Sequence, residues 1–578
     1  MLILIAIFIL ILIPFAMMVL YLARPKFHIQ WLMAVLGILI VWPMVMIART
    51  EIPQSIALFS WKPETLFPLS PSLLLDNISW PFALALVTLA LSLMLTSVAQ
   101  MGYSSGRVVS HTSGSIENEL PGEPDGSIEA NPEKNPIEAE KEDTSSNWRA
   151  WAGILILTSL GLVAVMAGNL LTLLLAWAAL DIIELVILLG QTTQSSIRER
   201  IVLSFSARVA GIATLLLAAI VLWSKGGLLT FDAISSQVGL YLVLAAGLRL
   251  GVLPLHHLFS QEPPLKGGLG TALRLIPVSA SLILLARVAT VGIIGEAIPY
   301  LLGFSALAGL FAARNWLAAP DEISGRPYWI LGTASLVVAA TVQALPGASL
   351  AWGVASLFCG GLIFSTSLRH RYLIPILIFG VLNISALPFT PAWQGINLYQ
   401  FAPNQSHPYN LILSYVFSII FLIIQSVILA GFLRHALRGL IPGSIEQSPT
   451  VERWVWLLYP IGLIILPVAH LLIGWWSLPA FNEIPLSGWI LGAVALGIAA
   501  FVLYLSLRYP HASTLSNPTW IASSWNSIFS FNWLYRTLWG LFHTFSRLIA
   551  TISMVLEGEG GILWALVLLA LIFVFLQR

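Results

Sequence analysis

Two acidic residues stand in an otherwise apolar stretch and are the side chains of this sequence best suited to chemistry. Asp181 and Glu184 lie three positions apart in NLLTLLLAWAALDIIELVILLG, so a helix presents both on one face. Depending on burial and on neighbouring charges, a carboxyl group in such surroundings exchanges a proton or stays ionised beside a cation. The spacing therefore predicts a pair of carboxylates on one side of a buried helix.

Basic side chains in neighbouring apolar stretches are candidate partners for these acids. Arg208 lies in SFSARVAG, Arg249 in AAGLRLG, His256 and His257 in LPLHHLF, and Arg274 in TALRLIPV. A charge inside a bilayer is costly, so it usually faces a partner or a water-filled cavity and marks a path. The alternative is a static cluster of buried ion pairs that only fixes helix packing. The candidate ion-translocation residues are Asp181, Glu184, Arg208, Arg249, His256, His257 and Arg274.

The composition indicates that a membrane surrounds these residues. Of the 578 residues, 58% are hydrophobic and 9% are charged, whereas soluble globular proteins carry about 25% charged residues. A membrane-spanning helix needs about 20 mostly apolar residues. We therefore predict an all-α polytopic membrane protein with about 16 transmembrane helices. The predicted spans are 1–22, 28–48, 81–101, 149–167, 169–190, 201–223, 238–258, 269–290, 297–313, 327–344, 349–367, 372–388, 409–433, 453–475, 486–507 and 561–577.

Basic residues gather in the loops that follow the odd-numbered spans. Loops rich in Lys and Arg face the cytoplasm, so these loops predict a multi-pass protein of a bacterial or archaeal cell membrane with its N-terminus outside. The residues concerned are Arg24, Lys26, Arg198, Arg200, Arg314, Arg326, Arg369, Arg371, Arg434 and Arg438.

The sequence carries no sign of a redox group. Cys359 is the only cysteine, which excludes an intrachain disulfide and any cluster or zinc ribbon held by several cysteines. No dinucleotide-binding fingerprint or flavin motif is present. We predict no cofactor, no metal site and no nucleic-acid partner.

Two stretches between the apolar spans differ in composition. The segment 102–148 is rich in Pro, Gly, Ser and acids and cannot bury a core, so we predict a disordered cytoplasmic loop. The alternative is a tail that docks a partner. The segment 508–560 places aromatic residues among Arg536, His543 and Arg547. This pattern predicts an amphipathic lateral segment that lies in the membrane interface before the last span.

Six segments, taken in order, carry a resemblance to a known family. They are LLLDNIS, NLLTLLLAWAALDIIE, RERIVLSFSARVAGIATLL, GLRLGVLPLHHLFSQEPPLKGGLGTALRLIPVSASLILLAR, ALPFTPAWQG and the amphipathic stretch before the last helix. They resemble, over nearly the whole chain, the antiporter-like membrane subunit superfamily. Its members are the proton-translocating subunits of complex I, the large subunits of Mrp-type cation/proton antiporters and the membrane subunits of group 4 hydrogenases. The chain is identified as a divergent member.

The resemblance implies two inverted repeats with discontinuous helices. Pro277 in one span, and Pro388 and Pro391 after another, are breaks of the kind that such repeats contain. The predicted organisation is N-terminal transmembrane helices with an extracytoplasmic loop at 1–101, the acidic loop at 102–148, the first antiporter-like repeat at 149–290, the second repeat with C-terminal helices at 291–507, the lateral segment at 508–560 and the last transmembrane helix at 561–578.

The sequence departs from the family at the residues that carry charge. The glutamate of the family falls on Ala178, with Asp181 or Glu184 as its substitutes. Arg249 takes the place of a lysine, and Arg274 lies near the place of a histidine. The second-half lysine falls near Gln394. Because arginine does not release its proton in proteins, we expect these arginines to hold water or to tune the carboxylates, and not to carry protons themselves.

The resemblance implies a function in ion movement. We expect a membrane subunit of a respiratory or ion-translocating complex, conducting protons or Na⁺ along a hydrated intramembrane charge path. Its partners would be other membrane subunits of a respiratory, hydrogenase-like or Mrp-like complex and the lipid bilayer, and electrons would be handled by those subunits. One alternative is a degenerate, non-pumping paralogue that acts as a scaffold. Others are an independent solute transporter and a membrane glycosyltransferase-like enzyme with Asp76 as its acid.

Overall fold

The computed structural model divides the chain into two compact units, Met1–Leu515 and Ser516–Arg578. In the first unit it describes residues 1–24, 29–58, 70–104, 147–191, 195–256, 267–366, 371–400, 411–438, 455–476 and 486–508. In the second unit the described residues, 540, 543–544, 546–547, 550, 565–567 and 569–570, are all helical. The predicted acidic loop, the predicted lateral segment and the last predicted span therefore lie almost wholly outside the described residues, and so does His257.

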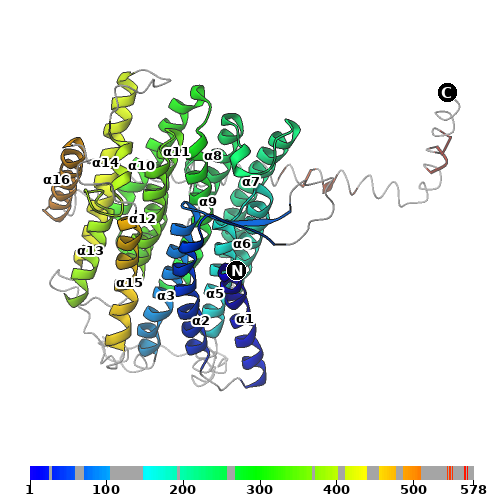
Figure 1. The fold of residues 1–578 in the computed structure, drawn as a ribbon, viewed down its shortest axis with the longest axis horizontal. Helices are drawn as coiled ribbons and strands as arrows, with labels where there is room; N and C mark the ends of the chain where they lie inside the picture. The colour runs from blue at the N-terminus through cyan, green and yellow to red at the C-terminus, as the bar shows by residue number, and fades with distance from the viewer. Residues whose placement is uncertain are drawn as a thin grey trace, which may run out of the picture. The chain divides into compact units, whose positions relative to one another are not determined.

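The described part of the first unit is built of helices that stand side by side (Figure 1). The described helices have 11 to 30 residues and form from apolar runs of the sequence. Inside a bilayer a single apolar segment can satisfy its backbone N–H and C=O groups only by forming a helix. The helices are α1 Leu2–Ala23, α2 Gln30–Ile47, α3 Ser79–Ser104, α5 Asn147–Val165, α6 Leu170–Gly190, α7 Ser195–Ser224, α8 Ser236–Leu250, α9 Gly267–Val291, α10 Ile298–Ala318, α11 Glu322–Val342, α12 Pro346–Phe364, α13 Ile374–Ile384, α14 Leu411–Leu437, α15 Val455–Trp476 and α16 Leu486–Arg508.

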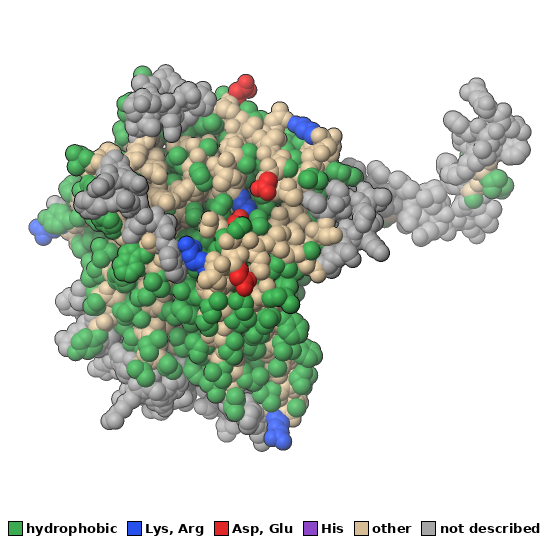
Figure 2. Space-filling view, viewed as in Figure 1, with side chains coloured by type: hydrophobic (Ala, Val, Ile, Leu, Met, Phe, Trp, Pro, Cys, Tyr) green, Lys and Arg blue, Asp and Glu red, His purple; other side chains and the backbone are tan. Residues whose placement is uncertain are grey.

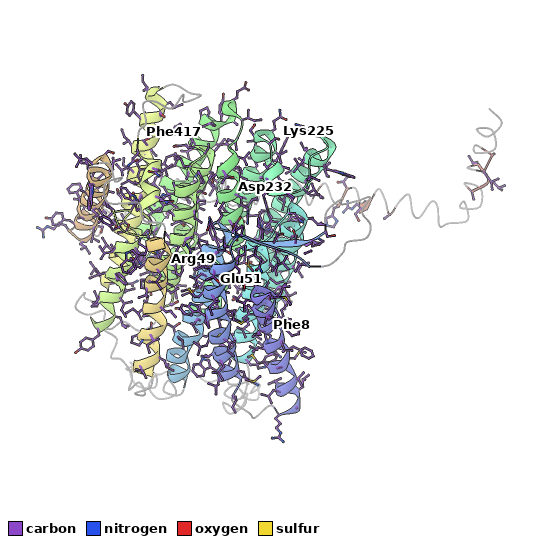
Figure 3. The ribbon with its side chains drawn as sticks, viewed as in Figure 1. Phe8, Arg49, Glu51, Lys225, Asp232 and Phe417 are labelled. Carbon is purple, nitrogen blue, oxygen red and sulfur yellow. The ribbon has the colours of Figure 1, made fainter. Side chains whose placement is uncertain are left out.

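Short elements connect these helices. The 3₁₀ turns are η1 Ala48–Glu51, η2 Phe231–Ala233, η3 Gly295–Ala297, η4 Arg371–Leu373 and η5 Trp393–Leu398. Two four-residue strands, β1 Gln54–Ala57 and β2 Ser72–Leu75, pair antiparallel with Gln54 opposite Leu75. Figure 3 shows Arg49 and Glu51 of η1, Lys225 directly after α7 and Asp232 of η2 above Phe8 of α1. Charged side chains thus occupy helix ends and connections here.

The prediction of an all-α polytopic membrane protein is confirmed. Within the described residues, twelve helices are long and apolar enough to cross a membrane. The predicted spans 238–258 and 372–388 are shorter than expected, because α8 has 15 residues and α13 has 11. Gly251, in the left-handed conformation (φ 73°), ends α8, and Pro388 and Pro391 lie beyond the end of α13. The count of sixteen spans and the inverted repeats stay predictions.

Burial distinguishes central helices from peripheral ones. The apolar windows of α3 and α9 are wholly buried, whereas only 17% of that of α16 is buried. α9 packs against α3, α5, α8, α11 and α12 and is therefore a central helix of the bundle. Figure 2 shows hydrophobic side chains covering much of the lower part of one face, as a lipid-facing surface requires. Charges on α9 or its neighbours must consequently find partners inside the protein.

Candidate functional site

Helix α6 positions the two acids. Its first turn is capped by Asn169, whose side chain accepts a hydrogen bond of 2.8 Å from the backbone N–H of Thr172, as a good N-cap residue does. Asp181 and Glu184 follow in the second half of the helix and are 1% and 2% exposed. The predicted sharing of one helix face is confirmed, and this face points into the bundle.

Arg249, in the last turn of α8, holds Asp181 by two contacts. Its Nη2 donates a hydrogen bond of 2.8 Å to Asp181 Oδ1, and its Nη1 donates to Oδ2. The guanidinium carbon also lies 4.3 Å from the centre of the Trp177 ring, one turn before the acid on α6. A planar guanidinium group matches a carboxylate in this way and stacks on an aromatic face as well. Asp181 and Trp177 together fix the end of α8 against α6.

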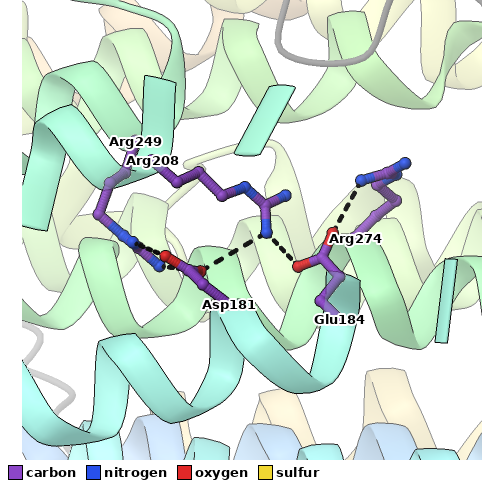
Figure 4. A network of polar contacts seen from close by, with 5 residues as sticks. All are labelled: Asp181, Glu184, Arg208, Arg249 and Arg274. Carbon is purple, nitrogen blue, oxygen red and sulfur yellow. Dashed lines mark hydrogen bonds and ion pairs between the residues drawn. The ribbon is translucent and has the colours of Figure 1, made fainter. Parts of the chain in front are cut away.

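Two further arginines complete the network that Figure 4 shows. Arg208 of α7 contacts Glu184 Oε2 through its Nη1, and the same nitrogen lies 3.7 Å from Asp181 Oδ1. Arg274 of α9 donates a hydrogen bond of 3.1 Å to Glu184 Oε1. Each acid of α6 is therefore contacted by two guanidinium groups, and Arg208 bridges the two acids. We call Asp181, Glu184, Arg208, Arg249 and Arg274 the charge network.

Close helix packing brings α7 to α8 at this point. A Cβ atom on Gly211 would lie 2.5 Å from Cγ of Arg249 and 3.0 Å from the backbone oxygen of Ala245. Only glycine leaves room for the Arg249 side chain to pass α7 on its way to Asp181. Gly211 is thus needed for Arg249 to reach Asp181.

A small pocket adjoins the acids between α6 and α7. Its volume is about 10 Å³, enough for the centre of one water molecule. Its polar lining residues are Asp181, Glu184, Arg208 and Ser204, and apolar residues complete the lining. Those apolar residues are Leu185, Leu188, Ile201 and Phe205. The pocket thus offers about the space of one water molecule beside Asp181 and Glu184.

The structure brings together five of the seven predicted residues. The predicted meeting of the acids with Arg208 and Arg249 is confirmed, and Arg274 joins them on Glu184. His256 is buried, and its Nδ1 lies 2.9 Å from the backbone oxygen of Pro254, a local contact that is not part of the network.

Sequence reasoning missed an ion pair outside the network. Arg287, near the end of α9, donates a hydrogen bond of 2.9 Å from Nη1 to Asp76 Oδ2 and lies 4.8 Å from the centre of the Phe231 ring. The other oxygen of Asp76 accepts hydrogen bonds from the backbone N–H groups of Ile78 and Ser79, so this side chain caps the start of α3. Both oxygens of Asp76 have structural tasks, which argues against its use as a catalytic acid. The signal for Arg287 was its charge inside an apolar run.

Ala178 stands at the place of a glutamate of the resembled family, and Gln394 lies near the place of a lysine. Ala178 is half-buried one turn before Asp181 on α6. Gln394 lies in η5, where its side chain packs against Gly347. Among the described residues, no group of three or more His, Cys, Asp and Glu side chains could hold a metal ion.

Comparison with known proteins finds similar structures but no similar sequence family. No protein-family model matches the sequence, and no curated protein sequence matches it either. Solved structures with a chain of similar fold include three membrane complexes. A chain of the Mrp complex from Dietzia sp. DQ12-45-1b has a TM-score of 0.65 and 12% identity over 99% of this chain and 63% of that one, so the present chain spans less than two thirds of its length.

The other two likenesses cover nearly all of the matched chain. A chain of the membrane-bound sulfane sulfur reductase, an archaeal respiratory membrane complex, has a TM-score of 0.61 and 14% identity over 98% of this chain and 99% of that one. A chain of respiratory complex I from Thermus thermophilus has a TM-score of 0.53 and 16% identity over 81% and 97%. The predicted resemblance is confirmed for the fold alone: this chain shares its fold with a chain of each of these three membrane complexes.

Proposed function

We propose that this chain is a membrane subunit of a respiratory or ion-translocating complex, and that it conducts protons or Na⁺ through the charge network. One observation carries the proposal: three guanidinium groups from α7, α8 and α9 meet two carboxylates of α6, all at most 6% exposed. Membrane proteins rarely keep ionised groups at this depth without a use for them. The similar chains belong to multi-subunit membrane complexes, which supports partner subunits here.

The chemistry of the side chains divides their roles. Arginine stays protonated in proteins, so the arginines supply fixed positive charge, and the acids Asp181 and Glu184 are the groups that can take up and release a proton. Arg208 contacts both acids through one nitrogen. A movement of Arg208 towards Asp181 would free the Oε2 atom of Glu184, and both residues line the small pocket. A proton can then pass from a hydronium ion in that pocket to this oxygen, leaving a water molecule behind.

The remaining expectations are part of the same proposal. Arg249 and Arg274 position the acids and tune their charge, and His256 and His257 belong to the ion path. Electron transfer would take place in partner subunits. The chain would lie in a bacterial or archaeal cell membrane with its N-terminus outside, and residues 149–290 and 291–507 would form its two repeats.

A second function is favoured by the completeness of the pairing. Both oxygens of each acid are contacted by guanidinium groups, as in a cluster that serves packing alone. The chain would then be a non-pumping paralogue that acts as a scaffold or as the partner subunit of another transporter.

Flux measurements separate the two functions. The full chain, purified with the subunits that accompany it and reconstituted in vesicles, is compared with Asp181→Asn and Glu184→Gln. We expect each variant to lower ion flux at least tenfold, because an amide cannot take up the proton. Asp76→Asn is the matched control, since it neutralises an arginine-paired acid outside the network and should leave flux unchanged. Equal flux in wild type and in both network variants would support the scaffold.

A further inference from the structure

The charge network carries more positive than negative charge. It contains three arginines and two acids, and every member is buried. Arginine keeps its charge at any pH that a cell experiences. When both acids are ionised, the network therefore keeps a net charge of about +1, and it becomes more positive when either acid binds a proton.

Arg326 adds a fourth buried guanidinium group. It lies in the second turn of α11, is 5% exposed, and stands 5.7 Å from the centre of the Phe364 ring. Its Nη1 is buried and has no hydrogen-bond partner among the described residues. α11 packs against α9, the helix that carries Arg274. A second buried guanidinium group therefore lies on a helix that packs against the helix of Arg274.

The oxygen atoms of the network are already engaged. Asp181 gives both of its oxygens to Arg249. Glu184 gives Oε1 to Arg274 and Oε2 to Arg208. A hard cation in a protein is held by oxygen ligands, and each carboxylate oxygen of the network already contacts an arginine. A metal cation entering here would have to displace arginines that repel it.

A proton makes a smaller demand. It needs one oxygen, which Arg208 can release by a shift between its two acids, and it needs no shell of ligands. We infer that Arg274 and Arg326 are specificity-determining residues, which close the path to alkali-metal cations while leaving the carboxylates open to protons. The expected effect on ion transport rests on the proposed function. The expected effect on Na⁺ binding rests only on the geometry of the charge network.

Binding of ²²Na⁺ to the purified full chain tests the inference without any transport. We expect no saturable binding to the wild type. Arg274→Gln should bind ²²Na⁺, because it frees Glu184 Oε1, adds an amide oxygen and removes one positive charge. Arg326→Gln should bind more weakly than Arg274→Gln, because it removes charge without freeing an oxygen. Arg274→Lys is the matched control: it keeps the charge and should exclude Na⁺ as the wild type does.

Ion transport in vesicles is the second test of the inference. We expect proton flux in the wild type to be the same in Na⁺ and in choline buffer, and ²²Na⁺ uptake to rise at least fivefold in Arg274→Gln. Saturable ²²Na⁺ binding to the wild type that Glu184→Gln abolishes would overturn the inference. So would Na⁺ exclusion that survives in both glutamine variants. A wild type that moves no ion at all would contradict the proposed function, and the binding measurements would still decide the selectivity.

Discussion

Asp181 and Arg249 are joined by both carboxylate oxygens and both terminal nitrogens of the guanidinium group, although they are 68 positions apart in the chain. The contact ties the last turn of α8 to the middle of α6. Trp177 covers the same guanidinium group, so the pair is shielded on one side by an aromatic ring. This pair is the anchor of the charge network, because Arg208 reaches Asp181 as well.

Loss of Arg249 alone should be costly. Arg249→Leu leaves Asp181 buried beside one remaining arginine, and breaking a buried ion pair from one side costs about 3–5 kcal/mol of unfolding free energy. The double variant Asp181→Leu/Arg249→Leu removes both charges and should recover most of that loss. Denaturant unfolding in detergent micelles, followed by circular dichroism, measures both. A double variant that is much less stable than Arg249→Leu would show that the ion pair stabilises the fold beyond compensating the charge of each partner.

Gly211 should tolerate no side chain. In Gly211→Ala the new methyl group meets Cγ of Arg249 at 2.5 Å, and overpacking of this kind costs about 1–3 kcal/mol. Because Arg249 must shift, ion flux should fall together with stability. Gly303→Ala is the matched control, since nothing lies within 4 Å of a Cβ there and alanine favours a helix over glycine. Equal behaviour of the two alanine variants would place Arg249 elsewhere than described.

The pair of Asp76 and Arg287 should serve stability only. Asp76→Ala removes the cap of α3, worth about 1 kcal/mol, and leaves the buried Arg287 without its carboxylate. Asp76→Asn can still cap the helix, so the order of unfolding free energies should be wild type, then Asn, then Ala. Flux per folded molecule should be the same in all three. A variant that loses flux without losing stability would assign this ion pair to the ion path.

His470 should be dispensable. Its ring stacks on Phe358 with 5.1 Å between centres, and its Nδ1 is buried without a hydrogen-bond partner among the described residues. A buried polar atom without a hydrogen-bond partner costs about 1–3 kcal/mol. His470→Leu should therefore keep or slightly raise the unfolding free energy and leave flux unchanged. A clear loss of flux would reveal a proton relay at this helix.

The charge network was predictable because its signals are local. Asp181 and Glu184 share a face by their spacing, and each arginine stands out as a charge in an apolar run. The partner of Arg287 was not predictable, since Asp76 lies 211 positions away and only packing brings α3 to α9. The ends of helices were also hard to place: hydropathy continues past Gly251, but the left-handed backbone there ends α8.

Helix α9 is tied down at two points on different sides. Arg274 binds Glu184 and Arg287 binds Asp76. The 13 positions between the two arginines (287 − 274) correspond to about 20 Å of rise and to directions about 140° apart around the helix axis. A helix fastened in this way resists sliding and turning, because either motion strains a bond at one end. Pro277 lies between the two fastenings, and a proline is where a helix bends. Bending of α9 at Pro277, between its two ion pairs, is thus the motion that this arrangement still permits.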